Sequence, residues 1–418
     1  MTEKDLQALL QGEAPEEKEL LRGLSVGQNS LTGFLAKQYL ETYIPAGGSK
    51  IKMVTGHRGS GKTHFIRTLL SEAEDREYLT VSFSARKVWL HDFREVYLEI
   101  LRQCGILRVL QGCANQIIRE MNYRPENIGP GKTFMDYLFE QGKGDAISRQ
   151  TIRSILREMF SRDPLLDNTF ASCCSMLTGE ILGHPTLEAA SRELILGYMN
   201  GDKTVKMAQL RPLGLSPVPV TKYNARHLLR SLCRVVRLAG YQGMVIAVDD
   251  METLLNRTAS DQRISYTKLR RDDAYESIRQ LIDDIDSMHH VLFLFGFDRE
   301  LMDDDSLGMK SYQALWMRVQ NEVISPRFNC FADIIDLDRF ADETYSADIL
   351  MQMATLLAEN LQAAGIRTSL LTVGKAEQLK ERAAFGNLGL PYLVNQAVRY
   401  SNEEEKENEE GGNDHGGI

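Results

Sequence analysis

The sequence predicts an α/β fold built around a parallel sheet, and three observations lead to this prediction. Residues 243–248 and 291–295 form near-continuous apolar runs, which are typical of strands covered on both faces of a parallel sheet. Amphipathic stretches with helical spacing lie between the apolar runs, and strands that alternate with helices indicate an α/β core. A shorter apolar run at residues 51–55 leads directly into a glycine-rich turn, after which helical spacing begins.

Further elements follow from the same patterns. Residues 78–84 alternate apolar and polar side chains, as expected for a strand, and residues 334–337 form a short apolar run. Helices are predicted wherever apolar residues recur at helical spacing. They cover residues 62–74, 91–104, 272–287 and most of 105–240 and 344–401.

The chain is expected to divide into a core and several helical parts. Far more chain separates the glycine-rich turn from the apolar run at 243–248 than is needed to cross a sheet, so the helical stretch between them is predicted to be an insertion. The last residues are rich in glutamate and glycine and poor in apolar side chains, which indicates disorder. The predicted parts are an N-terminal arm or helix (1–22), a core in two segments (23–104 and 241–341), a helical insertion (105–240), a C-terminal helical lid (342–401) and a disordered acidic tail (402–418).

Composition and charge exclude several classes of protein. None of the 6 cysteines forms a C-x-x-C pair, so a zinc site is not expected, and their sparse use fits the reducing cytosol. The N-terminal residues are polar and charged, unlike a signal peptide, and no apolar run approaches the roughly 20 residues of a membrane span. A cytoplasmic protein with no membrane partner is therefore expected. With a net charge of −9 and a pI of about 5.5, the chain would need a local basic patch to bind nucleic acid.

The pattern of a phosphate-binding loop, G-x-x-x-x-G-K-[ST], is matched in full by Gly56-His57-Arg58-Gly59-Ser60-Gly61-Lys62-Thr63. The glycines let successive N–H groups point at phosphate oxygens, and the helix that follows adds its positive end. Lys62 would contact the β- and γ-phosphates of ATP, and the Thr63 hydroxyl would ligate Mg²⁺. Because the loop lies between a strand and a helix, the sequence predicts a P-loop NTPase core with Mg-ATP as its ligand. The residues predicted to bind the nucleotide are Gly56, His57, Arg58, Gly59, Ser60, Gly61, Lys62, Thr63, His64 and Asp298, with packing of the helix start as the alternative for His64.

Acidic residues at the end of a second strand complete the predicted site. Asp249 follows the run at 243–248 and is predicted to hold Mg²⁺ together with Thr63. Asp250 is the first candidate to activate the attacking water, and Glu252 is the second. Many P-loop ATPases carry a glutamate at the position of Asp250, which is shorter by one methylene, so a slow or inactive site is one alternative. Capping of a helix start is the other alternative for both residues.

Side chains outside the loop supply further candidates. Asp298 or Arg299, after the strand at 291–295, would sense the γ-phosphate, with a simple turn as the alternative. Arg318 and Arg327 are candidates to reach the phosphate of a neighbouring subunit in a homo-oligomer, with ordinary salt bridges as the alternative.

Two groups of basic residues are candidates for contact with DNA. Arg226, Arg230, Arg234 and Arg237 share one helix face, which could contact DNA or another subunit, with a solvated surface as the alternative. The segment 257–271 carries five basic residues and Tyr266, which would suit phosphate contact and base stacking, although Asp261 and the following Asp272 and Asp273 dilute its charge.

Four stretches of the sequence resemble a known family. They are Gly59-Ser-Gly-Lys-Thr-His-Phe65, the strand with its acidic end at 240–252, Ala274-Tyr-Glu-Ser-Ile-Arg279 and Ser311-Tyr-Gln-Ala-Leu315. Over roughly residues 24–400 the chain resembles the ATP-binding proteins of bacterial BREX phage-defence systems, the BrxC/BrxD type. The resemblance implies an AAA+-like core with a helical lid, assembly into rings or filaments, other defence-system proteins as partners, and a role in blocking phage DNA.

Two departures from the family pattern bear on activity. The family carries Asp-Glu at the magnesium strand where this chain has Asp249-Asp250, and an arginine of the lid is replaced by Tyr392, with Arg399 as a candidate substitute. The first hypothesis is therefore an oligomeric ATPase that acts on double-stranded DNA or on partner proteins. The second is a nucleotide-gated assembly scaffold with slow or no hydrolysis that recruits an effector. A small-molecule transferase is less favoured, because no acceptor pocket is legible in the sequence.

Overall fold

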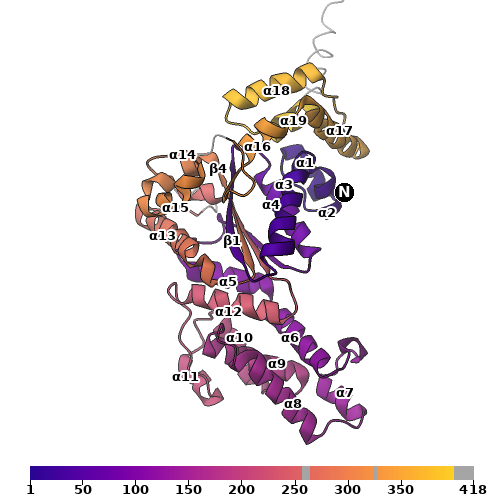
Figure 1. Cartoon of the computed structure of the whole chain (residues 1–418), viewed down its shortest axis with the longest axis vertical. Helices are drawn as coiled ribbons and strands as arrows, with labels where there is room; N and C mark the ends of the chain where they lie inside the picture. Colours follow the sequence, from indigo (N-terminus) through magenta and orange to yellow (C-terminus); the bar gives the residue numbers. More distant parts are fainter. Residues whose placement is uncertain (257–263, 324–326, 400–418) are drawn as a thin grey trace, which may run out of the picture.

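The computed structural model describes residues 1–256, 264–323 and 327–399, and the predicted acidic tail at 402–418 lies outside them. The chain is a mixed α/β protein with a five-stranded sheet at its centre (Figure 1). The lid helices lie at one end of the molecule and the helices of the predicted insertion at the other. Among the described helices, none combines the length and the apolar character that crossing a membrane requires.

The sheet is parallel throughout and has the strand order β2-β3-β4-β1-β5. All five strands were predicted from the apolar runs, and the structure confirms each to within a few residues. Thr55 of β1 pairs with Phe297 of β4, and Ser84 of β2 pairs with Asp249 of β3, so the strands end together at one edge. The strands are β1 (Ser49–Gly56), β2 (Leu79–Ser84), β3 (Met244–Asp249), β4 (Val291–Asp298) and β5 (Ile334–Asp336).

One face of the sheet packs against the N-terminal helices, α4 and the lid. Side chains alternate between the two faces along a strand, so Val54, Val245 and Leu292 point to this side. They form one buried cluster with Phe65 and Leu69 of α4. The helices on this side are α1 (Glu3–Gln11), α2 (Lys18–Gly23), α3 (Asn29–Leu35), the π-helix η1 (Ala36–Tyr43), α4 (Lys62–Glu74), α16 (Leu337–Thr344), α17 (Ala347–Ala363), α18 (Val373–Phe385) and α19 (Leu390–Arg399).

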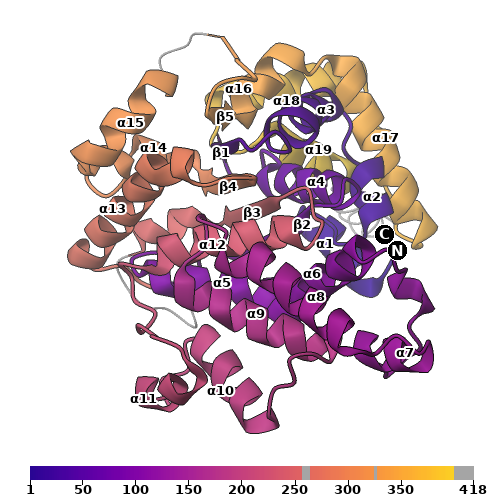
Figure 2. The ribbon, with the colours of Figure 1, turned by 60° about the horizontal axis from the view of Figure 1, so that its bottom comes forward.

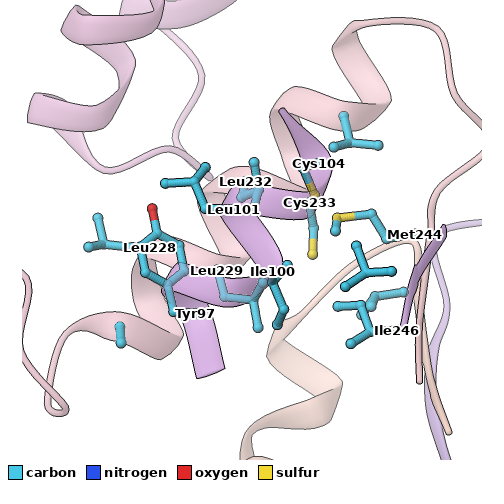
Figure 3. Close-up of a cluster of buried hydrophobic side chains, with 14 of the residues drawn as sticks. Tyr97, Ile100, Leu101, Cys104, Leu228, Leu229, Leu232, Cys233, Met244 and Ile246 are labelled. Atoms are coloured by element: carbon cyan, nitrogen blue, oxygen red, sulfur yellow. The ribbon is translucent and has the colours of Figure 1, made fainter. Parts of the chain in front are cut away.

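The opposite face packs against α5 (Phe93–Cys104) and α12 (Ala225–Leu238), which lie side by side in Figure 2. Figure 3 shows their contact with the sheet, where Ile100, Leu232 and Ile246 meet among other apolar side chains. The buried side chains of this face continue without a break into the helices of the predicted insertion. The domain boundaries at 105 and 240 therefore stay predictions.

The remaining helices belong to the predicted insertion and to the core segments that flank β4. In the insertion they are α6 (Ile106–Glu120), η2 (Pro125–Asn127), α7 (Phe134–Glu140), α8 (Ala146–Leu156), η3 (Arg157–Ser161), α9 (Asn168–Leu182), α10 (Ala189–Met199), α11 (Met207–Leu210) and η4 (Arg211–Leu213). Around β4 they are η5 (Met251–Leu255), α13 (Lys268–Asp284), η6 (Ile285–Ser287), α14 (Arg299–Asp303), η7 (Met309–Ser311) and α15 (Gln313–Val323).

Candidate functional site

The predicted site residues meet at the edge where the parallel strands end. Gly56 ends β1, Asp249 ends β3 and Asp298 ends β4, and the pairing of these strands places their ends next to one another. The carboxyl ends of strands in an open α/β sheet are where ligands bind, because the connecting loops diverge there. The structure thus brings together three of the sequence-predicted segments.

The glycine-rich residues 56–63, here called the phosphate loop, curl between β1 and α4. Gly59 and Gly61 adopt left-handed backbone angles, with φ of 79° and 90°. Such angles are costly for residues with a Cβ, and a Cβ on Gly59 would also lie 2.3 Å from the Cβ of Tyr392. Gly61 is the N-cap of α4, so the unpaired amides at the start of this helix face the loop. This arrangement fits an anionic phosphate group.

Two polar groups of the phosphate loop support the fit to phosphate. The Lys62 ammonium lies 3.1 Å from the carbonyl oxygen of Gly56 and 2.9 Å from that of His57, so it is folded back over the loop. It also forms an ion pair of 2.7 Å with Asp298. The Ser60 hydroxyl is buried and has no hydrogen-bond partner among the described residues. A buried hydroxyl left unpaired is costly, so a ligand oxygen in the loop would satisfy it.

Thr63 and Asp249 lie together, as the sequence predicts for a magnesium site. The Thr63 hydroxyl donates a hydrogen bond of 2.6 Å to the Asp249 carboxylate. Burial raises the pKa of Asp249, and the neighbouring Asp250 carboxylate raises it further. A bound cation would therefore offset the free-energy cost of the buried negative charge on Asp249. Hydroxyl and carboxylate oxygens are the donors that Mg²⁺ prefers.

Gly296 of β4 keeps the space beside Asp249 open. A Cβ at this position would lie 2.4 Å from the Asp249 Oδ1 atom, so any larger residue would push the carboxylate aside. No cluster of three or more His, Cys, Asp or Glu in the described ranges could hold a metal by itself. The two protein oxygens of Thr63 and Asp249 therefore fit a Mg²⁺ that is also coordinated by phosphate and water.

Asp250 and Glu252, the predicted catalytic carboxylates, are both held by Arg86. The Arg86 guanidinium lies 2.9 Å from an oxygen of each carboxylate, and the Ser84 hydroxyl donates to Asp250 at 2.5 Å. Asp250 has a left-handed backbone with φ of 61°, which is strained for a non-glycine residue. Burial, and then the Asp298 carboxylate, raise the pKa of Glu252. Asp250 is the N-cap of η5 but its side chain makes no capping bond, so its carboxylate is committed to Ser84 and Arg86 instead.

Asp298 and Arg299, the two candidates for γ-phosphate sensing, differ in their surroundings. Asp298 contacts Lys62 directly, so it influences a bound phosphate through the lysine rather than by contact of two anions. Arg299 turns away from the phosphate loop toward β5, where it pairs with Asp336 and lies 3.6 Å from Asp338. The Asp338 carboxylate accepts a hydrogen bond of 2.7 Å from the His57 amide. It also lies 2.8 Å from the Nδ1 atom of the His57 ring.

His64 faces away from the phosphate loop. Its Nε2 atom lies 2.8 Å from the Ser25 hydroxyl, between α2 and α4. Burial, and then the charge of Arg67, lower the pKa of His64 to about 4, so the ring is neutral at physiological pH. Of the two interpretations that the sequence left open, the geometry favours packing of the helix start for the side chain, and leaves only the main-chain amide for a ligand.

The first turn of α19 lies directly on the outer side of the phosphate loop. The Gly389 amide donates 2.8 Å to the carbonyl of Arg58, and the Tyr392 amide lies 3.2 Å from the carbonyl of Gly59. The Cβ of Tyr392 packs over Gly59. Arg399 reaches back to Asn395 within α19 at 3.4 Å.

Arg318 and Arg327, the candidates to reach a neighbouring subunit, differ in their surroundings. Arg318 on α15 pairs with Asp283 of α13 at 3.1 Å, which is the salt bridge that the sequence left as the alternative. Arg327 is exposed, at the start of the segment that leads to β5. Their role across a subunit boundary stays a prediction.

Several residues of the segment predicted to contact DNA instead contact other parts of the fold. Tyr266 is fully buried and its hydroxyl accepts from the Leu90 amide at 3.0 Å, so the prediction that it stacks on a base is wrong. Arg271 is buried and donates to the carbonyl of Leu254 at 2.7 Å. Arg270 lies over the ring of Trp89 at 4.8 Å. Arg257 and Arg263 lie outside the described residues.

The arginines of α12 tie this helix to its neighbours. Arg226 pairs with Asp284 of α13 at 3.1 Å, and Arg234 pairs with Asp163 before α9 at 2.6 Å. Arg237 donates 2.9 Å to the carbonyl of Tyr241. The stripe that the sequence offered as a DNA surface thus holds the sheet-covering helix in place.

Four residues of the site were missed from the sequence: Ser84, Arg86, Asp338 and Gly389. The end of the strand at 78–84 was a usable signal for the first two, because polar residues at the ends of adjacent parallel strands meet. That β2 neighbours β3 was not evident without the sheet order. Gly389 was visible as a glycine at the start of a lid helix, but its contact with the phosphate loop depends on tertiary structure.

Comparison with known proteins places the chain in a family. The family model described as BREX system ATP-binding protein BrxC/D matches residues 2–384. None of the curated proteins and none of the solved structures compared with the chain matches it. The matched range contains the phosphate loop, Asp249, Asp250 and Arg86, and ends just before Gly389. Because the match covers most of the 418 residues, this chain belongs to the BREX system ATP-binding protein BrxC/D family.

Proposed function

We propose that the chain binds Mg-ATP at the phosphate loop of an AAA+-like P-loop core and hydrolyses it. The hydrogen bond of 2.6 Å between Thr63 and Asp249 is the observation that supports this best, because it joins the start of α4 to the end of β3. The family description, ATP-binding protein, names the nucleotide. Loop amides, Lys62 and the two metal-facing oxygens would together offset the charge of a triphosphate.

The chemistry follows from where the carboxylates lie. A carboxylate takes a proton from water, the water oxygen attacks the γ-phosphorus, and the bond from that phosphorus to the bridging oxygen breaks. The products are ADP and inorganic phosphate, with the proton released later from the carboxylate. Asp250 follows Asp249 directly and is the first candidate for the base, and Glu252 is the second because it also borders Asp298. Mg²⁺, when bound, would stabilise the charge on the transferred phosphoryl group.

The place of this activity is a bacterial phage-defence system, as the family description suggests. We propose that ATP binding drives the assembly of several copies, and that the assembly acts on DNA or on partner proteins of the same system. Arg318 and Arg327 are the candidates to contact a neighbour's phosphate. Since Tyr266 and Arg271 are buried, a DNA contact through the described part of this segment would have to use the exposed Lys268 and Arg270.

A second candidate function is a nucleotide-gated scaffold that binds ATP with slow or no hydrolysis and recruits an effector. One observation favours it: the two oxygens of Asp250 are occupied by Ser84 and Arg86. These contacts hold the carboxylate in place and compete with a water molecule for its oxygens, which disfavours its action as a base.

Calorimetry with Mg-ATP tests the binding step. Lys62→Ala should weaken binding about tenfold to a hundredfold, since a charged hydrogen bond is worth roughly 1.5–3 kcal/mol. Lys4→Ala is the matched control, because the exposed Lys4 ammonium pairs with Glu16 in the connection between α1 and α2. Equal affinity of the Lys62→Ala variant and the unaltered chain would end the proposal.

Phosphate release separates the two candidate functions. Steady-state release by the unaltered chain above the background of Lys62→Ala supports the ATPase, and stimulation by duplex DNA supports action on DNA. Retention of bound ATP without release supports the scaffold. Particle size with a non-hydrolysable ATP analogue, compared with the nucleotide-free chain, tests assembly.

A further inference from the structure

Arg86 occupies a position that the proposed reaction does not explain. It lies in the connection between β2 and α5. Its Nη2 atom is 2.9 Å from an Asp250 oxygen and 2.9 Å from a Glu252 oxygen. A single guanidinium therefore contacts both carboxylates that could activate water.

The remaining contacts of Asp250 complete its restraint. The Ser84 hydroxyl donates to its Oδ2 atom at 2.5 Å, while Arg86 holds Oδ1. Its main-chain amide donates to the Asp249 carboxylate at 2.9 Å, and its backbone is left-handed. Each oxygen of the carboxylate thus has one fixed contact, and the main chain that carries it is fixed as well. A general base needs an open lone pair within about 3 Å of the water that it deprotonates.

Glu252 is no freer than Asp250. Its Oε1 atom contacts Arg86, and its Oε2 atom lies 3.4 Å from the Asp298 amide. The Arg86 pair also favours the charged form of a glutamate that burial otherwise drives toward the neutral form. Loss of the guanidinium would free one oxygen on each of the two carboxylates at once.

We propose that Arg86 is a positioning residue that holds Asp250 and Glu252 away from the attacking water, so that ATP turnover is fast only when its guanidinium leaves. This rests on the proposed function, since it assigns a restraint to the same carboxylates. The Arg86 side chain is 43% exposed, so an anionic group can bind the guanidinium and draw it away from the carboxylates without disturbing the sheet. Within the described part of the chain, the Arg86 side chain forms its ion pairs with these two carboxylates, which makes the restraint separable from the fold.

The experiment compares steady-state ATP turnover of the full chain with that of Arg86→Ala and Arg86→Lys, at saturating Mg-ATP. Turnover should rise about tenfold or more in Arg86→Ala and less in Arg86→Lys, because lysine keeps the charge but not the two-way contact. The KM for ATP should stay within about twofold, since Arg86 does not touch the phosphate loop. Arg102→Ala is the matched control. Arg102 lies on α5 and pairs with Glu99 on the surface, so its replacement should leave turnover unchanged.

A pH profile distinguishes this restraint from a merely structural role. Without the guanidinium, the ionised form of Glu252 loses its partner, so its pKa rises further and the acid limb of turnover should move to higher pH. A structural defect would lower the whole profile without moving the limb. Should Arg86→Ala not fold, Ser84→Ala removes the other restraint on Asp250 and should give a smaller rise.

Two outcomes overturn the proposal. Turnover that falls in Arg86→Ala would show that the guanidinium assists the reaction, as a charge beside the phosphate. Turnover that stays at the level of the unaltered chain would show that Arg86 restrains nothing. Calorimetry on the same samples keeps the tests apart: absent ATP binding in every sample refutes the proposed function, whereas binding without acceleration refutes only the restraint.

Discussion

The main-chain amide of Gly389 donates a hydrogen bond of 2.8 Å to the carbonyl oxygen of Arg58, which joins the lid to the phosphate loop. When loop amides point inward at a phosphate, the loop carbonyls must point outward, and the lid takes up two of them. The first turn of α19 therefore stabilises the phosphate-binding conformation from outside. Any motion of the lid is coupled to the geometry of the loop.

Replacing Gly389 should weaken nucleotide binding. A Cβ there would lie 2.2 Å from the Ser60 amide nitrogen and 2.5 Å from the Gly59 carbonyl carbon, both rigid backbone atoms. Gly389→Ala must therefore push the lid off the loop, at a cost of about 1–3 kcal/mol. We expect roughly tenfold weaker Mg-ATP binding by calorimetry. Gly374→Ala on α18, where a Cβ meets nothing within 4 Å, should leave binding unchanged, and an equal loss in both variants would contradict the coupling.

Asp249→Asn should remove the dependence of binding on magnesium. The neutral amide cannot offset the charge of a cation beside the Thr63 hydroxyl, although its shape is kept. In thermal denaturation, the unaltered chain should gain more stability from Mg-ATP than from ATP with a chelator, and the variant should not. Asp286→Asn, an exposed carboxylate remote from the loop, serves as the control. A magnesium effect that persists in Asp249→Asn would remove this carboxylate from the site.

His64 should make the fold sensitive to acid. Its pKa is about 4 in the folded chain against 6.5 when free, so the unfolded chain binds the proton more readily between these values. Stability is then complete above about pH 6.5 and falls as the pH drops toward 4. The free energy of unfolding should fall by on the order of 2–3 kcal/mol, which is less than the full pKa difference implies because the ring keeps a little contact with water. In denaturation experiments, the stability of His64→Gln should decline less steeply over this pH window. The exposed His227→Gln is the control. Parallel stability curves for His64→Gln and the unaltered chain would contradict a role of His64 in acid sensitivity.

Lys52 should stabilise the approach to β5. This lysine of β1 is fully buried, and its ammonium donates to the carbonyls of Phe331 at 2.8 Å and Ala332 at 2.6 Å. Lys52→Met keeps the volume but leaves these carbonyls unpaired, so the free energy of unfolding should fall by about 1–3 kcal/mol. Lys50→Met removes only a partly exposed pair with Asp333 and should cost less than about 1 kcal/mol in urea denaturation. The reverse ranking would contradict the assignment.

Much of the sheet and the central chemistry could be predicted from the sequence. Parallel strands covered on both faces leave continuous apolar runs, and the phosphate loop has few alternatives to its glycine spacing, so β1, β3 and β4 were predicted close to their observed bounds. Thr63 was predicted from the spacing of the phosphate loop, and Asp249 from the end of an apolar strand. The structure places the two side chains in contact, and their role in holding Mg²⁺ stays a prediction.

The rest of the site depends on information that a single sequence does not hold. Arg86 reaches Asp250 only because β2 lies beside β3, which sheet order decides and local pattern does not. Tyr266 failed as a DNA contact because its burial comes from packing against the segment at Leu90. A basic segment with an aromatic residue has the same composition whether it faces solvent or a core.

The order of strands also has a consequence for how the chain is made. β1 and β2 are neighbours in the chain, but the sheet separates them by β3 and β4. β2 cannot pair with β3 until residue 249 has left the ribosome, and β1 cannot pair with β4 until residue 298 has, which takes on the order of ten seconds or more at ordinary synthesis rates. During that interval the two apolar strands and the phosphate loop lack the strands that they pack against. Chaperones therefore matter most while the chain is being synthesised.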